Sequence, residues 1–183
     1  MRKFLLLLSC FMMMAVTSTA RADDLKLDPE NTLVLDLSYG RVLIKLMPEV
    51  APKHVAQIKT LVRQGFYDGL IWHRVIDGFM AQTGDPTGTG TSGSTLPDIS
   101  AEFSSVNYIR GTVGMARSND PDSANSQFFI CFDNTGCSSL QGQYTVWGQV
   151  VEGMQFVDQI QRGEPPATPD KIVSLKVLAD VKQ

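Results

Sequence analysis

Residues 72–85 read WHRVIDGFMAQTGD, and they decide the fold that we expect for this 183-residue chain. Short apolar runs interrupted by Gly and Asp are typical of β-strands joined by tight turns. In strand alternation, Trp72, Arg74 and Ile76 share one face of the strand. An arginine on an apolar face needs a hydrogen-bonding partner, because an unpaired buried charge is costly. Gln82 falls on the same side as Arg74 if the intervening turn preserves the register.

A second stretch, GTVGMARSNDPDSANSQFFI at residues 111–130, places a polar loop directly before paired aromatic residues. Considered by itself, this stretch predicts a turn followed by a core strand. Considered by itself, Arg74 would be interpreted as one partner of a salt bridge at the rim of the fold. Together the two stretches resemble the hallmark motifs of the cyclophilin family of peptidyl-prolyl isomerases. Trp72 replaces the usual leading aromatic residue, and the residues that follow match in register. The resemblance extends over residues 31–178.

This resemblance implies an all-β fold, an eight-stranded antiparallel closed β-barrel capped by two α-helices. It implies that Arg74 is the catalytic residue. The groove residues that it implies form a proline pocket, polar positioning groups and a peptide-aligning strand: Phe79, Met80, Gln82, Ala116, Arg117, Gln127, Phe129, Leu140 and Tyr144.

The chemistry of prolyl isomerisation fits these residue types. Rotation about an X-Pro bond must only overcome amide resonance, so no group has to be protonated or attacked. A guanidinium can donate a hydrogen bond to the prolyl nitrogen, whose lone pair becomes available only in the twisted state. We therefore expect proline-containing polypeptides as substrates, with no metal ion and no cofactor.

Two residues and the length of one loop depart from the family pattern. Tyr144 stands where many eukaryotic members have histidine. Ser139 stands where tryptophan often contacts cyclosporin, so we expect weak binding of that drug. The loop from Met115 to Pro121 is one residue longer than in the commonest eukaryotic pattern.

Patterns outside the two motifs predict the remaining elements. Two alternating apolar runs in residues 33–46 predict a β-hairpin. Residues 51–65 carry a helical apolar spacing, with proline near the start and glycine at the end. A second short helix is expected from residue 154 to near residue 163, and residues 173–177 predict a closing strand.

The N-terminus has the order of a secretory signal peptide. A basic start is followed by an apolar run and an Ala-Arg-Ala site, which predicts cleavage between Ala22 and Asp23. We therefore expect a signal peptide at residues 1–22, an isomerase domain at residues 23–183, and a periplasmic location with exported polypeptides as clients. A lipoprotein anchored at Cys10 is the less favoured alternative, because the apolar run continues beyond that residue.

The two remaining cysteines, Cys131 and Cys137, would then meet oxidising conditions. The sequence leaves open whether they pair. Because Cys131 lies in an apolar run, we favour an inert core thiol.

Composition excludes several classes of function. The net charge of −3 argues against a nucleic-acid binder with a general basic surface. We also expect a monomer that does not insert into membranes. The two histidines show no zinc-ligand spacing, and we expect His54 on a helix surface and His73 packed beside Arg74. Residues 84–93 are glycine-rich but lack the ending of a phosphate-binding loop, so we expect a flexible loop at the groove.

Two other functions compete with that of an isomerase. A serine hydrolase is remote, because no G-x-S-x-G elbow occurs. A non-catalytic proline-peptide-binding module, or a holding chaperone on the same fold, is the main alternative. The presence of Arg74 favours the enzyme.

Overall fold

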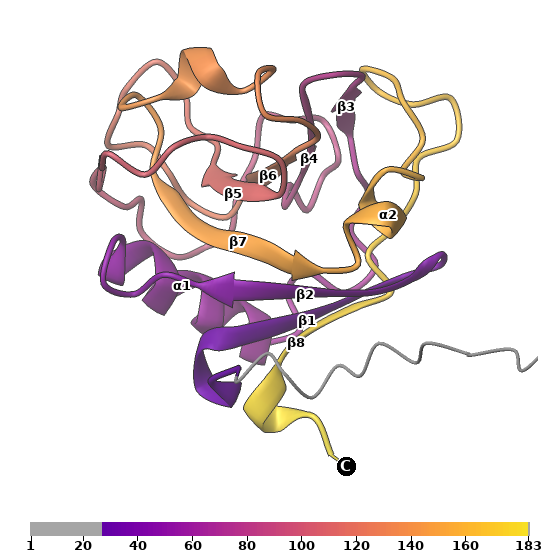
Figure 1. Ribbon diagram of the computed structural model, residues 1–183, viewed down its shortest axis with the longest axis horizontal. Helices are drawn as coiled ribbons and strands as arrows, with labels where there is room; N and C mark the ends of the chain where they lie inside the picture. Colours follow the sequence, from indigo (N-terminus) through magenta and orange to yellow (C-terminus); the bar gives the residue numbers. More distant parts are fainter. Residues whose placement is uncertain (1–26, 183) are drawn as a thin grey trace, which may run out of the picture.

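The computed structural model describes residues 27–182, so the expected signal peptide lies outside the described residues. One eight-stranded sheet forms the framework of the molecule (Figure 1). Its strands are β1 (Thr32–Leu37), β2 (Gly40–Leu46), β3 (Arg74–Ile76), β4 (Met80–Thr83), β5 (Thr112–Met115), β6 (Phe128–Cys131), β7 (Val146–Glu152) and β8 (Ser174–Val177). The helices are α1 (Pro52–Arg63) and α2 (Met154–Val157), with 3₁₀ turns η2 (Pro29–Asn31), η3 (Ser138–Leu140) and η4 (Leu178–Asp180).

The sheet is a curled half-barrel, so the expectation of a closed barrel is wrong. The strand order is β3-β4-β6-β5-β7-β2-β1-β8, and the two edge strands β3 and β8 do not pair with each other. Between them the chain makes only single bridges, such as the one that joins Ile71 to Lys171. The outer edge of β3 is bridged instead by the loop after α2, through the pair Val75 and Gly163.

The two faces of the sheet have different roles. On one face, Val75, Ala81, Ile130 and Val113 lie opposite one another on successive strands and belong to the main hydrophobic core. In this core the ring of Phe128 contacts three aromatic rings edge-on, those of Tyr67, Trp72 and Trp147. The alternate residues of the same strands point to the other face, where a second, smaller apolar cluster forms.

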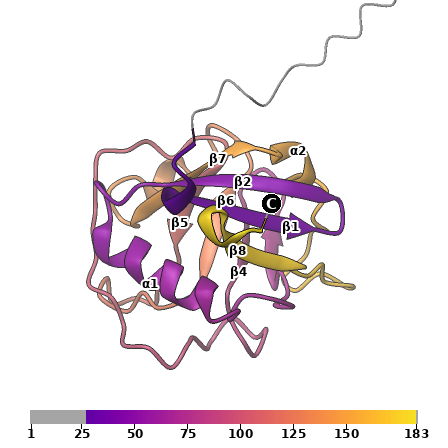
Figure 2. The ribbon, with the colours of Figure 1, turned by 90° about the horizontal axis from the view of Figure 1, so that it is seen from below.

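Helix α1 packs against β8, as the view from below shows (Figure 2), and α2 packs against β2. The expected helix surface position of His54 is wrong, because this residue is fully buried. Its Nδ1 lies 2.6 Å from Oε2 of Glu102. The same carboxylate accepts the backbone N–H groups of Lys53 and His54, so a distant residue caps the first turn of α1. Burial lowers the pKa of His54, and Glu102 opposes this effect only in part.

Other local expectations have mixed outcomes. The hairpin is confirmed, with Leu37 paired to Gly40 across the turn. Helix α2 ends at Val157, so it is shorter than expected. Val173 lies outside β8 and is 59% exposed, although its parity matches the buried residues of that strand. Trp72 precedes β3 and enters the main core, so it does not share the face of Arg74.

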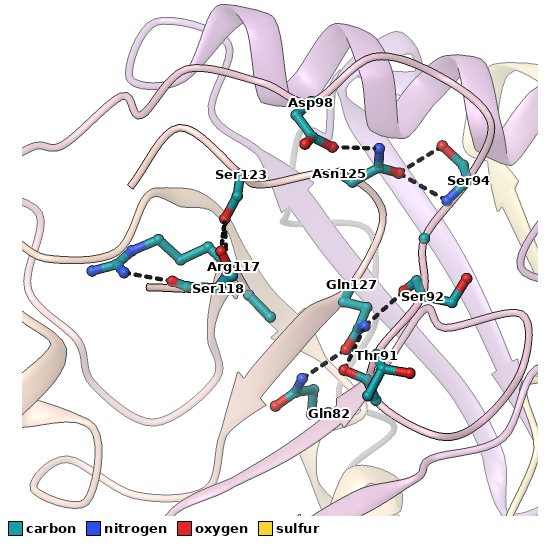
Figure 3. Close-up of a pocket in the computed structure, with 13 residues that line it drawn as sticks. Gln82, Thr91, Ser92, Ser94, Asp98, Arg117, Ser118, Ser123, Asn125 and Gln127 are labelled. Atoms are coloured by element: carbon teal, nitrogen blue, oxygen red, sulfur yellow. Dashed lines mark hydrogen bonds between the residues drawn. The ribbon is translucent and has the colours of Figure 1, made fainter. Parts of the chain in front are cut away.

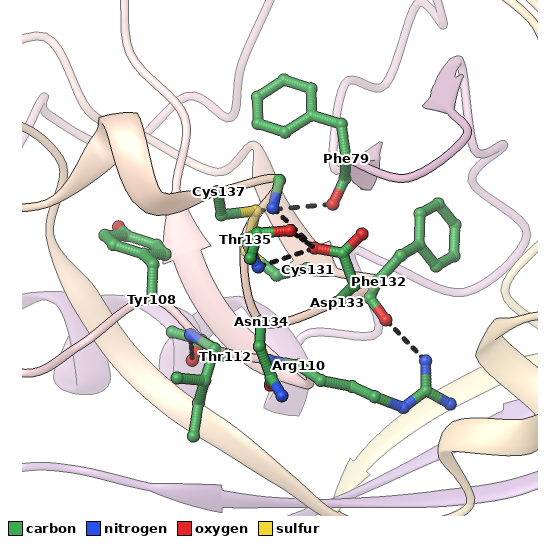
Figure 4. Close-up of a disulfide and its surroundings, with 12 residues drawn as sticks. Phe79, Tyr108, Arg110, Thr112, Cys131, Phe132, Asp133, Asn134, Thr135 and Cys137 are labelled. Carbon is green, nitrogen blue, oxygen red and sulfur yellow. Dashed lines mark hydrogen bonds between the residues drawn. A yellow bond between two sulfur atoms is a disulfide. The ribbon is translucent and has the colours of Figure 1, made fainter.

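Cys131 and Cys137 form a disulfide, which corrects the expectation of a free core thiol at Cys131. Cys131 lies opposite Met80 on the neighbouring strand, and Sγ of Cys137 lies 3.4 Å from the carbonyl oxygen of Phe79 (Figure 4). The disulfide belongs to the smaller apolar cluster and directly precedes η3. It therefore joins strand β6 to the turn that carries Leu140.

Candidate active site

Strand register brings the key residues of the two sequence motifs into one row. Arg74 on β3 lies opposite Gln82 on β4, which lies opposite Phe129 on β6, which lies opposite Gly114 on β5. Directly paired residues project from the same face of a sheet, so these side chains share the face opposite the main core. The expectation that Gln82 lies on the same side as Arg74 is confirmed.

A cavity of about 250 Å³ opens on this face. It is lined by the expected groove residues, except Gln127: Arg74, Phe79, Met80, Gln82, Ala116, Arg117, Phe129, Leu140 and Tyr144. We call this cavity the apolar pocket. Its floor and walls are mainly aromatic and aliphatic, and the Arg74 guanidinium carbon lies 5.9 Å from the centroid of the Phe79 ring.

Residues that sequence reasoning missed support the pocket from below. The ring of Tyr108 stacks on that of Phe129, with 5.9 Å between centroids. Gly114 allows this packing, because a Cβ there would lie 2.5 Å from Cζ of Phe129 and 2.7 Å from the Tyr108 hydroxyl oxygen. Gly114 lies within the second motif, which gives it no role of its own at the site, and Tyr108 lies outside both motifs.

A second, polar cavity of about 590 Å³ adjoins the apolar pocket and shares Gln82, Ala116 and Arg117 with it (Figure 3). Gln82 donates a hydrogen bond of 2.9 Å to Oε1 of Gln127. Gln127 in turn donates to the carbonyl oxygens of Gly90 and Ser92. The two glutamines therefore tie the strands to the glycine-rich loop, and together the two cavities form a groove that runs along the sheet.

The glycine-rich loop of residues 84–93 is organised around one carboxylate. Asp85 is buried, which would raise its pKa, but hydrogen bonds from Thr87, Ser92 and Gly90 outweigh burial and hold the pKa at about 2. Backbone N–H groups of Thr87 and Ser92 both donate to it. Beneath this loop His73 is buried, and burial lowers its pKa. The loop borders the groove as expected.

Two arginines face the groove in different settings. Arg117 lies over the ring of Tyr144 at 4.4 Å, and its guanidinium donates to the backbone oxygens of Gln143 and Ser118. Arg74 forms an ion pair with Glu164, in which Nε lies 2.9 Å from Oε1. Glu164 is a further residue that sequence reasoning missed, since nothing in its local sequence connects it with Arg74.

Residues 27–182 contain neither a cluster of potential metal ligands nor a helix of membrane-spanning length. No three His, Cys, Asp or Glu side chains in this part of the chain are grouped to hold a metal ion. No helix there is long and apolar enough to cross a bilayer.

The family assignment follows from comparison with known proteins. The family model described as "Cyclophilin type peptidyl-prolyl cis-trans isomerase/CLD" matches residues 32–177. The chain belongs to this family. It is 53% identical to a "Probable peptidyl-prolyl cis-trans isomerase" from Brucella suis, over 85% of this chain and 86% of that protein. It is 36% identical to mouse "Peptidyl-prolyl cis-trans isomerase-like 3", over 72% and 82% of the two chains.

Solved structures agree with this assignment. The crystal structure of the cyclophilin AquaCyp293 from Hirschia baltica matches with a TM-score of 0.78 and 32% identity, covering 85% of this chain and 77% of that one. A Cryptosporidium parvum cyclophilin solved in the presence of the dipeptide Ala-Pro matches with a TM-score of 0.73 and 26% identity, covering 80% and 98%. The chain is thus a cyclophilin-type peptidyl-prolyl cis-trans isomerase.

Proposed function

We propose that this isomerase acts on X-Pro bonds of exported polypeptides in the periplasm, with Arg74 as its catalytic residue. The observation that carries the catalytic assignment is the position of the Arg74 side chain at the rim of the apolar pocket, beside the Phe79 ring. A proline ring held in this pocket would present its nitrogen to the rim.

The geometry suits catalysis by hydrogen bonding alone. The uncatalysed rotation has a barrier of about 18–20 kcal/mol, which arises from amide resonance. An N–H donor beside the prolyl nitrogen stabilises the twisted state, in which the lone pair is localised, more than either planar state. Arginine is suited to this role because its guanidinium stays charged and presents several donors in a rigid plane.

The rest of the groove would hold the peptide on both sides of the proline. Phe129, Leu140 and Phe79 supply apolar contact for the ring. The adjoining polar cavity has hydroxyl and amide groups that can pair with a peptide backbone. The relative solved with Ala-Pro supports a peptide that contains proline as the ligand.

Exchange NMR on a short Ala-Pro peptide tests the catalytic assignment. Arg74→Ala should lower the cis/trans exchange rate on the order of a hundredfold or more, because it removes the donor specific to the transition state. Arg41→Ala is the matched control, since it removes an exposed arginine from the β1–β2 hairpin that lines neither cavity. Equal exchange rates for Arg74→Ala and the control would refute the assignment.

The same experiment separates the isomerase from a holding chaperone. A chaperone on this fold would bind the peptide and suppress aggregation of an unfolded client with or without Arg74. If the wild-type chain binds Ala-Pro peptides but leaves their exchange rate unchanged, the holding function is the correct one.

Two features support the export of the chain. Residues 1–22 have the order of a cleavable signal peptide. The Cys131–Cys137 disulfide fits an oxidising compartment, because cytosolic thiols are kept reduced. The mass of the protein recovered from a periplasmic fraction tests this proposal. We expect a chain that begins at Asp23, whereas a lipid-modified Cys10 or an unprocessed cytoplasmic chain would contradict it.

A further inference from the structure

The environment of Arg74 contains a carboxylate for which the proposed chemistry gives no role. Nε of Arg74 lies 2.9 Å from Oε1 of Glu164, and the two side chains are 42% and 51% exposed. Among residues 27–182, this is the ion pair that engages an arginine of the apolar pocket. We propose that Glu164 is a positioning residue, which orients the Arg74 guanidinium for hydrogen bonding to the substrate; this inference rests on the catalytic role proposed for Arg74.

The segment that carries Glu164 is fixed directly to the strand that carries Arg74. The backbone N–H of Val75 donates to the carbonyl oxygen of Gly163, and the N–H of Gly163 donates back to Val75, both at 2.8 Å. Each of these residues is next in sequence to a member of the ion pair. A backbone bridge along the outer edge of β3, where the loop after α2 runs, therefore holds the two members of the ion pair close together (Figure 1).

Further contacts hold this loop in place. Arg162 forms an ion pair with Asp77 at 3.1 Å, and its guanidinium carbon lies 4.0 Å from the centroid of the Phe132 ring. Gly163 makes a tight turn, because a Cβ there would lie 2.5 Å from Cα of Pro166. Glu164 thus meets Arg74 from a built scaffold and not from a loose surface segment.

The ion pair engages the Nε side of the Arg74 guanidinium and leaves the terminal Nη groups available. Guanidinium has five N–H donors in one plane, and Nε supplies one of them. Because Glu164 fixes the orientation of that plane, the terminal Nη groups keep a defined direction beside the pocket. Without this ion pair the long arginine side chain would have to be ordered when the substrate binds, and catalysis depends on donors that are already in place.

Orientation, and not charge, should be the main contribution of Glu164. The pair is about half exposed, so water screens the attraction between the two charges. The placement of Nε beside an oxygen at 2.9 Å, in contrast, can be kept by an uncharged acceptor at the same position. A glutamine side chain supplies a carbonyl oxygen there with no charge, which separates the two effects.

Three variants test this proposal by exchange NMR with an Ala-Pro peptide. Glu164→Ala should lower kcat about threefold to tenfold and change KM by less than about twofold, because the loss is in orientation and not in peptide contact. Glu164→Gln should stay within about twofold of wild type. Asp77→Ala, which removes the carboxylate of the neighbouring ion pair of the same loop, is the matched control and should leave both constants unchanged.

A second readout follows Arg74 directly. The Arg74 side chain should be rigid in the wild-type chain and in Glu164→Gln, and mobile in Glu164→Ala, as ¹⁵N relaxation at Nε measures. Glu164→Ala should also have no further effect on turnover in an Arg74→Ala background.

The outcomes distinguish this inference from the proposed function. If Arg74→Ala loses turnover while Glu164→Ala matches wild type or is faster, the positioning role is wrong and the catalytic assignment stands. If Asp77→Ala is as impaired as Glu164→Ala, loop anchoring explains the loss and the inference fails. If Arg74→Ala retains turnover, both proposals fail.

Discussion

Reduction of the Cys131–Cys137 disulfide should destabilise the chain by an amount that its loop length determines. The two cysteines are separated by six positions in the sequence. A crosslink that closes a loop of about seven residues lowers the entropy of the unfolded chain by an amount worth about 2 kcal/mol at 25 °C. For a domain of this size, we expect the unfolding temperature to fall by roughly 4–8 °C.

Urea unfolding of the oxidised and reduced protein measures this effect. The double variant Cys131→Ala/Cys137→Ala is the control, because it should unfold like the reduced protein and be insensitive to reductant. The turn after Cys137 carries Leu140, so affinity for an Ala-Pro peptide should fall as well. Equal urea midpoints for oxidised and reduced wild-type protein would refute this reasoning.

Three further predictions concern the packing, the histidines and drug binding. Gly114→Ala should lower the unfolding free energy by about 1–3 kcal/mol and also lower kcat/KM, because the added Cβ would displace Phe129. Urea unfolding measures the first effect and exchange NMR the second. Burial lowers the pKa values of His54 and His73, so below pH 6.5 the unfolded chain binds more protons than the folded chain. The unfolding free energy measured in urea titrations should therefore fall from pH 7 to pH 5. Ser139→Trp should tighten cyclosporin binding measured by calorimetry, because indole adds contact area and a donor at an exposed position of η3; an unchanged affinity would contradict this.

Much of the candidate site could be predicted because its residues lie in two continuous motifs. Gln82 could be placed beside Arg74 from strand alternation, since both belong to one hairpin. The resemblance to cyclophilins supplied Phe129 and Leu140, which lie far from Arg74 in the sequence but line the same cavity. The remaining expectation, that Gln127 is a polar group of the groove, agrees with its hydrogen bond to Gln82.

What the sequence could not supply depends on contacts between distant segments. The capping of α1 by Glu102 leaves no local signal, and its contact with His54 accompanies the burial of that polar residue in the first turn of the helix. Trp72 has the right parity for the groove but precedes the strand, so alternation does not apply to it. The pairing of Cys131 with Cys137 needs the turn geometry, which sequence spacing alone does not fix.

The error about barrel closure and the failure to predict Glu164 have the same physical origin. In a closed barrel the outer edge of β3 would pair with β8, and the neighbours of Arg74 would be strand residues. Because the sheet is open, that edge is free to pair with Gly163, which brings Glu164 to the guanidinium. Edge strands need such protection, since their unpaired backbone groups would otherwise be available to other chains. The loop that protects the edge of the sheet is therefore also the loop that can orient Arg74.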